Sequence, residues 1–203
     1  MLNRIFVGIS LAIFIYYCLY NKYKYFMFFV INMTVIYDCI YLWINNIQKT
    51  IIITLFIFMF LFNLYLLYLY EINEQILILL VAIAQISDVY QYLCGIHFGI
   101  NRIGWLSKHK TYEGYIGGLI LTYLTFCFKL EFTQVLIIYL SGIIGGLLSS
   151  LFKRYLGIKD YSNLLGSHGG WLDRIDSIIL PCLIGSPIIY RKVLDYPGGC
   201  EKM

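Results

Sequence analysis

The sequence predicts an all-α, polytopic integral membrane protein with about seven transmembrane helices. Two features of its composition indicate this class: 61% of the 203 residues are hydrophobic and only 13% are charged. Soluble domains are roughly half apolar and about a quarter charged. The third feature is the length of the apolar runs, which approach the roughly 20 residues needed to cross a bilayer. These runs are continuous rather than alternating, which argues against a β-barrel.

Seven apolar runs follow one another along the chain, separated by short polar breaks. They cover residues 5–20, 25–44, 51–70, 76–98, 115–128, 133–152 and 178–190. We interpret the first run as a retained span rather than a signal peptide, because no small-residue cleavage site follows it and more spans come after it. We expect Pro181 and Pro187 to break the last run, because proline removes a helical hydrogen bond.

The chain is interpreted as one membrane domain, residues 1–203. Residues 1–75 hold three spans rich in Phe, Tyr and Ile, which we take as scaffold, whereas residues 76–190 carry the catalytic spans and loops and residues 191–203 form a tail. The scaffold contains an intramembrane carboxylate, Asp38. Two interpretations of it stay open: a functional group, or a side chain that reaches interfacial water near the end of its span.

A row of small residues marks the sixth run, at Gly142, Gly145 and Gly146. Small side chains let two helices approach closely inside a membrane. We therefore expect this glycine row to line a packing seam between helices.

The formal net charge of +4 is spread over the loops and forms no basic tail. This distribution does not favour nucleic-acid binding. With seven spans, one side of the membrane carries nine Lys and Arg residues and the other carries six. The positive-inside rule then places the richer side in the cytoplasm. Because two spans separate the charged loops 99–114 and 152–177, both loops face that same side.

The longest polar interruption runs from Ser150 to Asp176. It holds four basic side chains, three carboxylates and one histidine: Lys153, Arg154, Lys159, Arg174, Asp160, Asp173, Asp176 and His168. Asp173 and Asp176 are three residues apart at the start of an expected helix, so both lie on one face. Carboxylates gathered in this way repel one another unless a cation lies between them, and hard oxygen ligands suit Mg²⁺. The basic neighbours suit a polyphosphate. A salt-bridged loop is the alternative interpretation.

A second polar constellation occupies residues 87–118, two spans earlier. It begins with Asp88 in the fourth apolar run and continues with Lys110 and Glu113 in the following loop. Because this loop and the stretch 150–176 are expected on the same membrane face, the two constellations are candidates for two walls of one site.

Both constellations resemble motifs of the phosphatidate cytidylyltransferase family, the CDP-diacylglycerol synthases. Residues 150–176 follow S-x-F-K-R-x4-K-D-x-S-x2-L-G-x-H-G-G-x2-D-R-x-D, and residues 88–118 follow D-x3-Y-x2-G-x2-F-G and then S-x2-K-T-x-E-G-x2-G-G. The chain departs from the usual family residues at five positions within these motifs: Gln91, Lys108, His109, Tyr112 and Trp171. No departure removes a carboxylate or Lys110.

The resemblance implies a CTP-dependent nucleotidyltransferase that converts CTP and phosphatidate to CDP-diacylglycerol and pyrophosphate in phospholipid biosynthesis. It implies Asp160, Asp173 and Asp176 as catalytic metal ligands, with Lys159 and Asp88 as further catalytic residues. The residues that it implies in substrate binding are Lys110, Glu113, Ser150, Lys153, Arg154, His168, Gly169, Gly170 and Arg174. Mg²⁺ is the implied cofactor, and a second cation is left open.

The implied partners are CTP, phosphatidate and bilayer lipids, with a homodimer left open. The implied location is the cell (inner) membrane, multi-pass, with the active site facing the cytoplasm. One alternative is a related CTP-dependent membrane lipid enzyme, either a polyprenol kinase or a CDP-archaeol-type synthase. The other is a membrane transporter in which Asp38 and Asp88 carry ions. A transporter predicts charges along the middle of several spans, whereas the charges here cluster on two loops.

Overall fold

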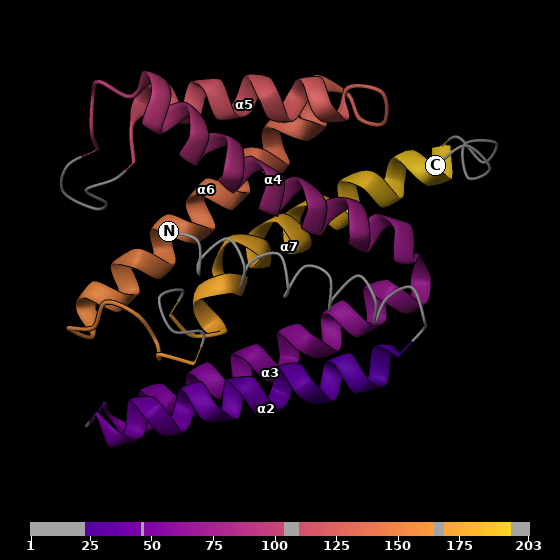
Figure 1. Cartoon of the computed structure of the whole chain (residues 1–203). Helices are drawn as coiled ribbons and strands as arrows, with labels where there is room; N and C mark the ends of the chain where they lie inside the picture. Colours follow the sequence, from indigo (N-terminus) through magenta and orange to yellow (C-terminus); the bar gives the residue numbers. More distant parts are fainter. Residues whose placement is uncertain (1–22, 46, 104–109, 165–168, 196–203) are drawn as a thin grey trace. The chain divides into compact units, whose positions relative to one another are not determined.

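The computed structural model describes residues 23–45, 47–103, 110–164 and 169–195. These described residues form six helices and no strand (Figure 1): α2 Lys24–Ile44, α3 Lys49–Ile72, α4 Glu74–Phe98, α5 Tyr112–Phe126, α6 Phe132–Tyr155 and α7 Leu172–Asp195. Each helix covers one of the expected apolar runs, so the all-α prediction is confirmed. The first expected span, residues 5–20, lies outside the described residues.

Three of the helices, α3, α4 and α6, are each long and apolar enough to cross a membrane, and α2 adds a shorter apolar segment, Phe28–Ile44. Large apolar side chains lie on their outer surfaces, and Ile57, Val89 and Leu148 are each more than half exposed. Soluble monomers rarely expose extended apolar surfaces, whereas lipid chains cover them readily. The chain is therefore a membrane protein.

Polar side chains cap the helices that begin at the charged loops and turns. Asn73 accepts hydrogen bonds from the backbone N–H groups of Gln75 and Ile76 at 3.0 and 3.2 Å, which begins α4. Thr111 accepts from the N–H of Gly114 at 3.1 Å, which begins α5. A capped N-terminus satisfies donors that have no partner within the helix, so these residues fix where each helix starts.

The last helix runs through both of its prolines, so the expectation that they would break it was wrong. Pro181 is buried, and a side chain added at Gly142 of α6 would lie 3.5 Å from its ring. Membrane helices tolerate proline where neighbouring helices compensate for the lost hydrogen bond. Packing against α6 accounts for the continuous helix here.

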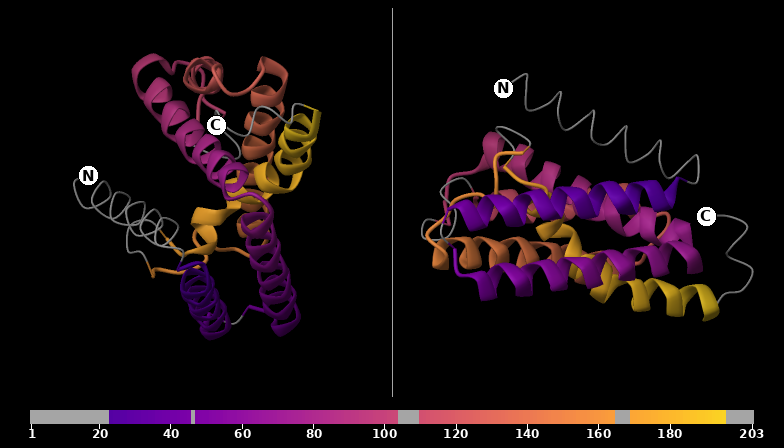
Figure 2. Two further views of the ribbon diagram at one scale, coloured as in Figure 1. Left: turned by 90° about the vertical axis from the view of Figure 1, so that its right-hand side faces the viewer. Right: turned by 90° about the horizontal axis from the view of Figure 1, so that it is seen from below.

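The chain divides into two compact units, each of which is discontinuous in sequence. The first contains residues 1–68 and 153–175, and the second contains residues 69–152 and 176–203. In the first unit α2 and α3 lie side by side (Figure 2), and the rings of Phe28 and Phe60 are 6.4 Å apart. The polar segment 153–175 belongs to this unit, with the N-terminal helices.

The second unit is held together by glycines at close helix contacts. A Cβ added at Gly114 of α5 would lie 2.8 Å from the carbonyl oxygen of Gln91 on α4, and one added at Gly145 of α6 would lie 2.8 Å from the carbonyl oxygen of Asp176 on α7. Both gaps are too short for a side chain. The predicted packing seam in α6 is therefore confirmed, and α7 is the helix that packs on it.

Candidate active site

Asp173, in the first turn of α7, connects three parts of the polar segment. Its Oδ1 accepts a hydrogen bond from the Lys153 ammonium at 2.7 Å, an ion pair that links α7 to the end of α6. Its Oδ2 accepts from the backbone N–H groups of Tyr161 at 2.9 Å and Gly170 at 2.8 Å. The carboxylate side chain is only 4% exposed. A buried carboxylate is stable only when hydrogen-bond donors surround it. Its bonds to these three donors fix the shape of the turn.

Gly169 lies in a cradle between two of the predicted metal ligands. Its φ is +77°, in the left-handed region that favours glycine. A Cβ added there would lie 2.6 Å from Asp173 Oδ2 and 3.3 Å from the Cβ of Asp160. The sequence predicted Gly169 as a substrate-binding residue. The structure shows that this position also allows the two aspartates to approach each other.

The end of α6 turns sharply and leads into exposed charge. Gly157 has a φ of +71°, and the Arg154 guanidinium donates to the carbonyl oxygen of Ile158 at 3.4 Å. Lys159 and Asp160 follow, and both side chains are exposed. The turn therefore presents a basic and an acidic side chain to a ligand, beside the buried Lys153–Asp173 pair.

Asp38 of α2 is a site residue whose role the sequence left open. Its side chain is fully buried. Oδ1 accepts a hydrogen bond from the Ser162 hydroxyl at 2.5 Å, and Oδ2 accepts from the Leu172 N–H at 2.9 Å. A Cβ added at Gly170 would lie 2.7 Å from both Asp38 Oδ2 and Ser162 Oγ. The available signal was the charge itself, since a carboxylate inside a span is rarely without a function. Its partner could not be inferred, because it lies more than 120 residues away.

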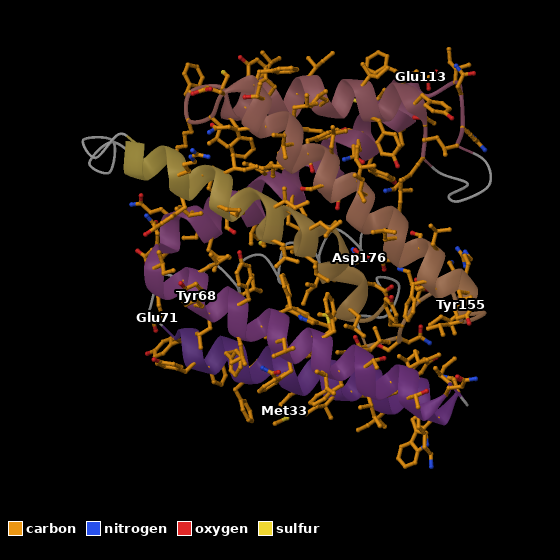
Figure 3. All side chains as sticks on the ribbon, turned by 180° about the vertical axis from the view of Figure 1, so that it is seen from behind. Met33, Tyr68, Glu71, Glu113, Tyr155 and Asp176 are labelled. Atoms are coloured by element: carbon orange, nitrogen blue, oxygen red, sulfur yellow. The ribbon has the colours of Figure 1, made fainter. Side chains whose placement is uncertain are left out.

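The second constellation is ordered around Glu113 and Thr111 (Figure 3 labels Glu113 in the first turn of α5). The Glu113 carboxylate accepts from the N–H groups of Ile100 and Asn101 at 3.2 Å and from the Asn101 side-chain amide at 2.7 Å. The N–H of Glu113 itself, followed by the donors of Asn101 and Ile100, holds the pKa of this carboxyl below its ordinary value. Glu113 thus ties the loop after α4 to the start of α5, and its predicted role in substrate binding stays a prediction.

Lys110 extends from the same loop toward α6. Its Nζ lies 5.6 Å from the centre of the Tyr115 ring and 3.8 Å from the position that a Cβ would take at Gly146. Lys110 therefore lies beside the second half of α6.

The remaining predicted residues lie on helices or outside the described part. Asp88 on α4, Asp176 on α7 (Figure 3) and Arg174 are half-buried. Ser150 donates its hydroxyl hydrogen bond to the Gly146 carbonyl at 2.8 Å, within α6. His168 lies outside the described residues, so its predicted role in substrate binding stays a prediction.

The predicted cation would need oxygen ligands, and carboxylates supply them in this part of the molecule. Within the described ranges, no three His, Cys, Asp or Glu side chains converge on a point where they could hold a metal ion. Gly169 nevertheless lies beside the Asp173 carboxylate and the Cβ of Asp160, and carboxylate oxygens are the ligands that Mg²⁺ prefers. Mg²⁺ and its three ligands therefore stay a prediction.

Within its described residues, the chain is a helical membrane protein whose basic and acidic side chains gather at the helix ends. The family comparison gives the particular class. A model of the cytidylyltransferase family matches residues 2–188, and the chain belongs to this family.

Individual relatives carry a more specific name. The phosphatidate cytidylyltransferase of Aquifex aeolicus is 31% identical over 141 residues, which cover 64% of this chain and 52% of the relative. The phosphatidate cytidylyltransferase of Staphylococcus aureus is 37% identical over 116 residues, covering 50% and 44%, and that of Staphylococcus saprophyticus is 36% identical over 113 residues, covering 48% and 43%. The chain thus spans about half the length of the curated relatives it matches.

Proposed function

We propose that this chain transfers the cytidylyl group of CTP to phosphatidate, giving CDP-diacylglycerol and pyrophosphate. The observation that carries the proposal is the turn built on Asp173, in which a buried Lys153–Asp173 pair and two backbone amides fix a segment that exposes Lys159 and Asp160. The family membership and the names of the three relatives support the same reaction.

The reaction needs charge control more than acid–base chemistry. A phosphate oxygen of phosphatidate attacks the α-phosphorus of CTP, the bond from that phosphorus to its bridging oxygen breaks, and pyrophosphate leaves. The attacking oxygen is already an anion, so no strong base is required. The barrier comes from the approach of two anions and from the charge that builds on the leaving group. Positioning and electrostatic neutralisation therefore carry the catalysis.

The exposed basic side chains of the polar segment would provide this neutralisation. Lys159 and Arg154 would bind triphosphate oxygens, and Lys110 would add positive charge from the loop before α5. When bound, Mg²⁺ held by Asp160, Asp173 and Asp176 would neutralise phosphate oxygens that attack or leave. Asp173 and Lys153 would keep the turn in the shape that presents these groups.

The proposal includes a location and a topology. About seven spans would cross the cell (inner) membrane, with the site on the cytoplasmic face, where CTP is available. The positive-inside rule supports this orientation, because the side that carries both charged loops has nine Lys and Arg residues against six on the other. The acyl chains of phosphatidate would remain in the bilayer, and a homodimer is compatible with this arrangement.

Incubation of the purified protein in detergent with CTP, phosphatidate and Mg²⁺ tests the proposal. We expect CDP-diacylglycerol and pyrophosphate in equal amounts, measured by mass spectrometry and by a coupled pyrophosphate assay. A polyprenol and an archaeal ether phosphatidate serve as competing acceptors. A phosphorylated polyprenol without CDP-diacylglycerol would replace the proposal by the kinase alternative.

A further inference from the structure

The buried carboxylate of Asp38 is the part of the first unit that the proposed reaction does not use. It lies on α2, within the N-terminal helices, and its side chain is 0% exposed. A carboxylate in this position is costly unless donors surround it. It accepts hydrogen bonds from the polar segment, from the Ser162 hydroxyl and the Leu172 N–H. The carboxylate on α2 and the donors of the polar segment therefore satisfy each other.

Asp38 binds the polar segment at two points, one just after Asp160 and one just before Asp173. On the entry side it accepts the Ser162 hydroxyl, whose oxygen in turn accepts from the N–H of Leu164 at 3.3 Å. On the exit side it accepts the N–H of Leu172, the first residue of α7. That N–H is one of the donors that a helix start leaves without an internal partner. Asp38 thus caps α7 from another helix.

The neighbouring residues show that the approach is close and specific. Gly170 lies so near that an added Cβ would be 2.7 Å from Asp38 Oδ2. One turn further along α2, the Tyr41 hydroxyl accepts a hydrogen bond from the Asn163 amide at 3.1 Å. Residues three apart share a helix face, so Asp38 and Tyr41 contact the polar segment from one face of α2.

We propose that Asp38 is a positioning residue for cytidylyl transfer, holding the Ser162 turn and the start of α7 so that Asp160 and Asp173 stay in place. This inference rests on the proposed function. It assigns the N-terminal helices a direct part in shaping the site. Asp38 itself touches neither substrate, and it acts through Ser162 and Leu172.

Three substitutions separate positioning from packing. Asp38→Asn keeps an oxygen for the Leu172 N–H and an amide that can donate to Ser162 Oγ, so we expect turnover within about 3-fold of wild type, since both bonds survive in neutral form. Asp38→Leu fills similar space without an acceptor. A packing role requires only that this space is filled, so it predicts normal turnover for this variant. A positioning role predicts that turnover per folded molecule falls by about 10-fold or more, because two buried donors lose their acceptor.

The matched control is Cys39→Ala, the buried neighbour on the same helix. Each variant is assayed well below its own unfolding temperature, and Ser162→Ala serves as a second test if Asp38→Leu does not fold. We expect Ser162→Ala to lower turnover and Cys39→Ala to leave it unchanged. Normal turnover in Asp38→Leu or in Ser162→Ala would overturn the inference.

A measurement without substrate keeps this inference distinct from the proposed reaction. Hydrogen exchange of the amides in residues 160–175 should be about 10-fold or more faster in Asp38→Leu, because the Leu172 amide loses its acceptor, and unchanged in Cys39→Ala. Equal exchange in the wild type and in Asp38→Leu contradicts positioning, whatever the reaction is. Absence of CDP-diacylglycerol from the wild type, with the exchange difference present, refutes only the proposed function.

Discussion

Lys153 and Asp173 form an ion pair of 2.7 Å whose side chains are 12% and 4% exposed. Because twenty residues separate them in sequence, the pair closes the polar segment into a loop between the last turn of α6 and the first turn of α7. Breaking a buried pair by removing one partner costs about 3–5 kcal/mol, since the other charge is left without compensation. The same ion pair therefore stabilises the loop and holds it in the shape that the proposed catalysis needs.

The carboxylates of α7 give the first prediction. Asp173→Asn and Asp176→Asn should each lower turnover by at least ~100-fold, because each removes a major electrostatic contribution to the transition state. Steady-state kinetics with phosphatidate in detergent micelles would measure this. Asp195 is not a suitable control, because its side chain lies outside the described part. Cys182→Ala, a buried change on the same helix, should leave turnover unchanged. Rates near wild type in both aspartate variants would contradict the metal and charge roles of these residues.

Two glycines with positive φ give a matched test of the cradle. Gly169 and Gly157 have φ values of +77° and +71°, so alanine strains both backbones by about 1–2 kcal/mol. Only at Gly169 would the new Cβ meet the Asp173 carboxylate, at 2.6 Å, whereas nothing lies within 4 Å of it at Gly157. We expect Gly169→Ala to abolish most activity and Gly157→Ala to keep it. Equal activities of the two variants would mean that position 169 requires glycine because of backbone strain, and not because Asp160 and Asp173 lie close to it.

Lys159 tests the binding of CTP. Its side chain is exposed, so Lys159→Met should leave the unfolding temperature unchanged. The KM for CTP should rise by about 10-fold or more, as expected when a charged hydrogen bond to phosphate is lost. Lys129→Met, in the turn between α5 and α6, provides the control for a lost surface charge. An unchanged KM for CTP in Lys159→Met would remove this residue from the nucleotide site.

Glu113 gives a prediction about pH. Its pKa lies below the ordinary value of 4.5 because donors of its own backbone and of Asn101 and Ile100 favour the charged form. Because the pKa is lowered in the folded protein, the charged carboxylate stabilises the loop fully at pH values above the ordinary pKa. This stabilisation is lost as the pH falls through the lower pKa of the folded state. The protection factors of the Ile100 and Asn101 amides, which correct for the intrinsic pH dependence of exchange, should therefore fall in acid. In Glu113→Gln the exchange should be faster at neutral pH and should lose this acid dependence. The same profile in both proteins would show that another group holds the loop.

The helices could be predicted from the sequence because lipid imposes a simple requirement: each apolar run of sufficient length has to satisfy its own backbone groups. The motifs likewise identified the polar segment and its glycines. What the sequence did not indicate is which partners the charges take. Asp38 binds residues more than 120 positions away, and Glu113 turns toward its own loop. Pro181 was misjudged because its cost depends on α6, and this tertiary contact leaves no local pattern.

The central claim is tested most directly by following the phosphorus atoms of CTP into lipid. The purified protein is given phosphatidate, Mg²⁺ and CTP labelled at either the α- or the γ-phosphorus, and the lipid fraction is counted. Cytidylyl transfer predicts that the α-label enters the lipid and that the γ-label leaves in pyrophosphate. Lipid that carries the γ-label and no α-label would contradict the account, because it would show phosphorylation rather than cytidylyl transfer.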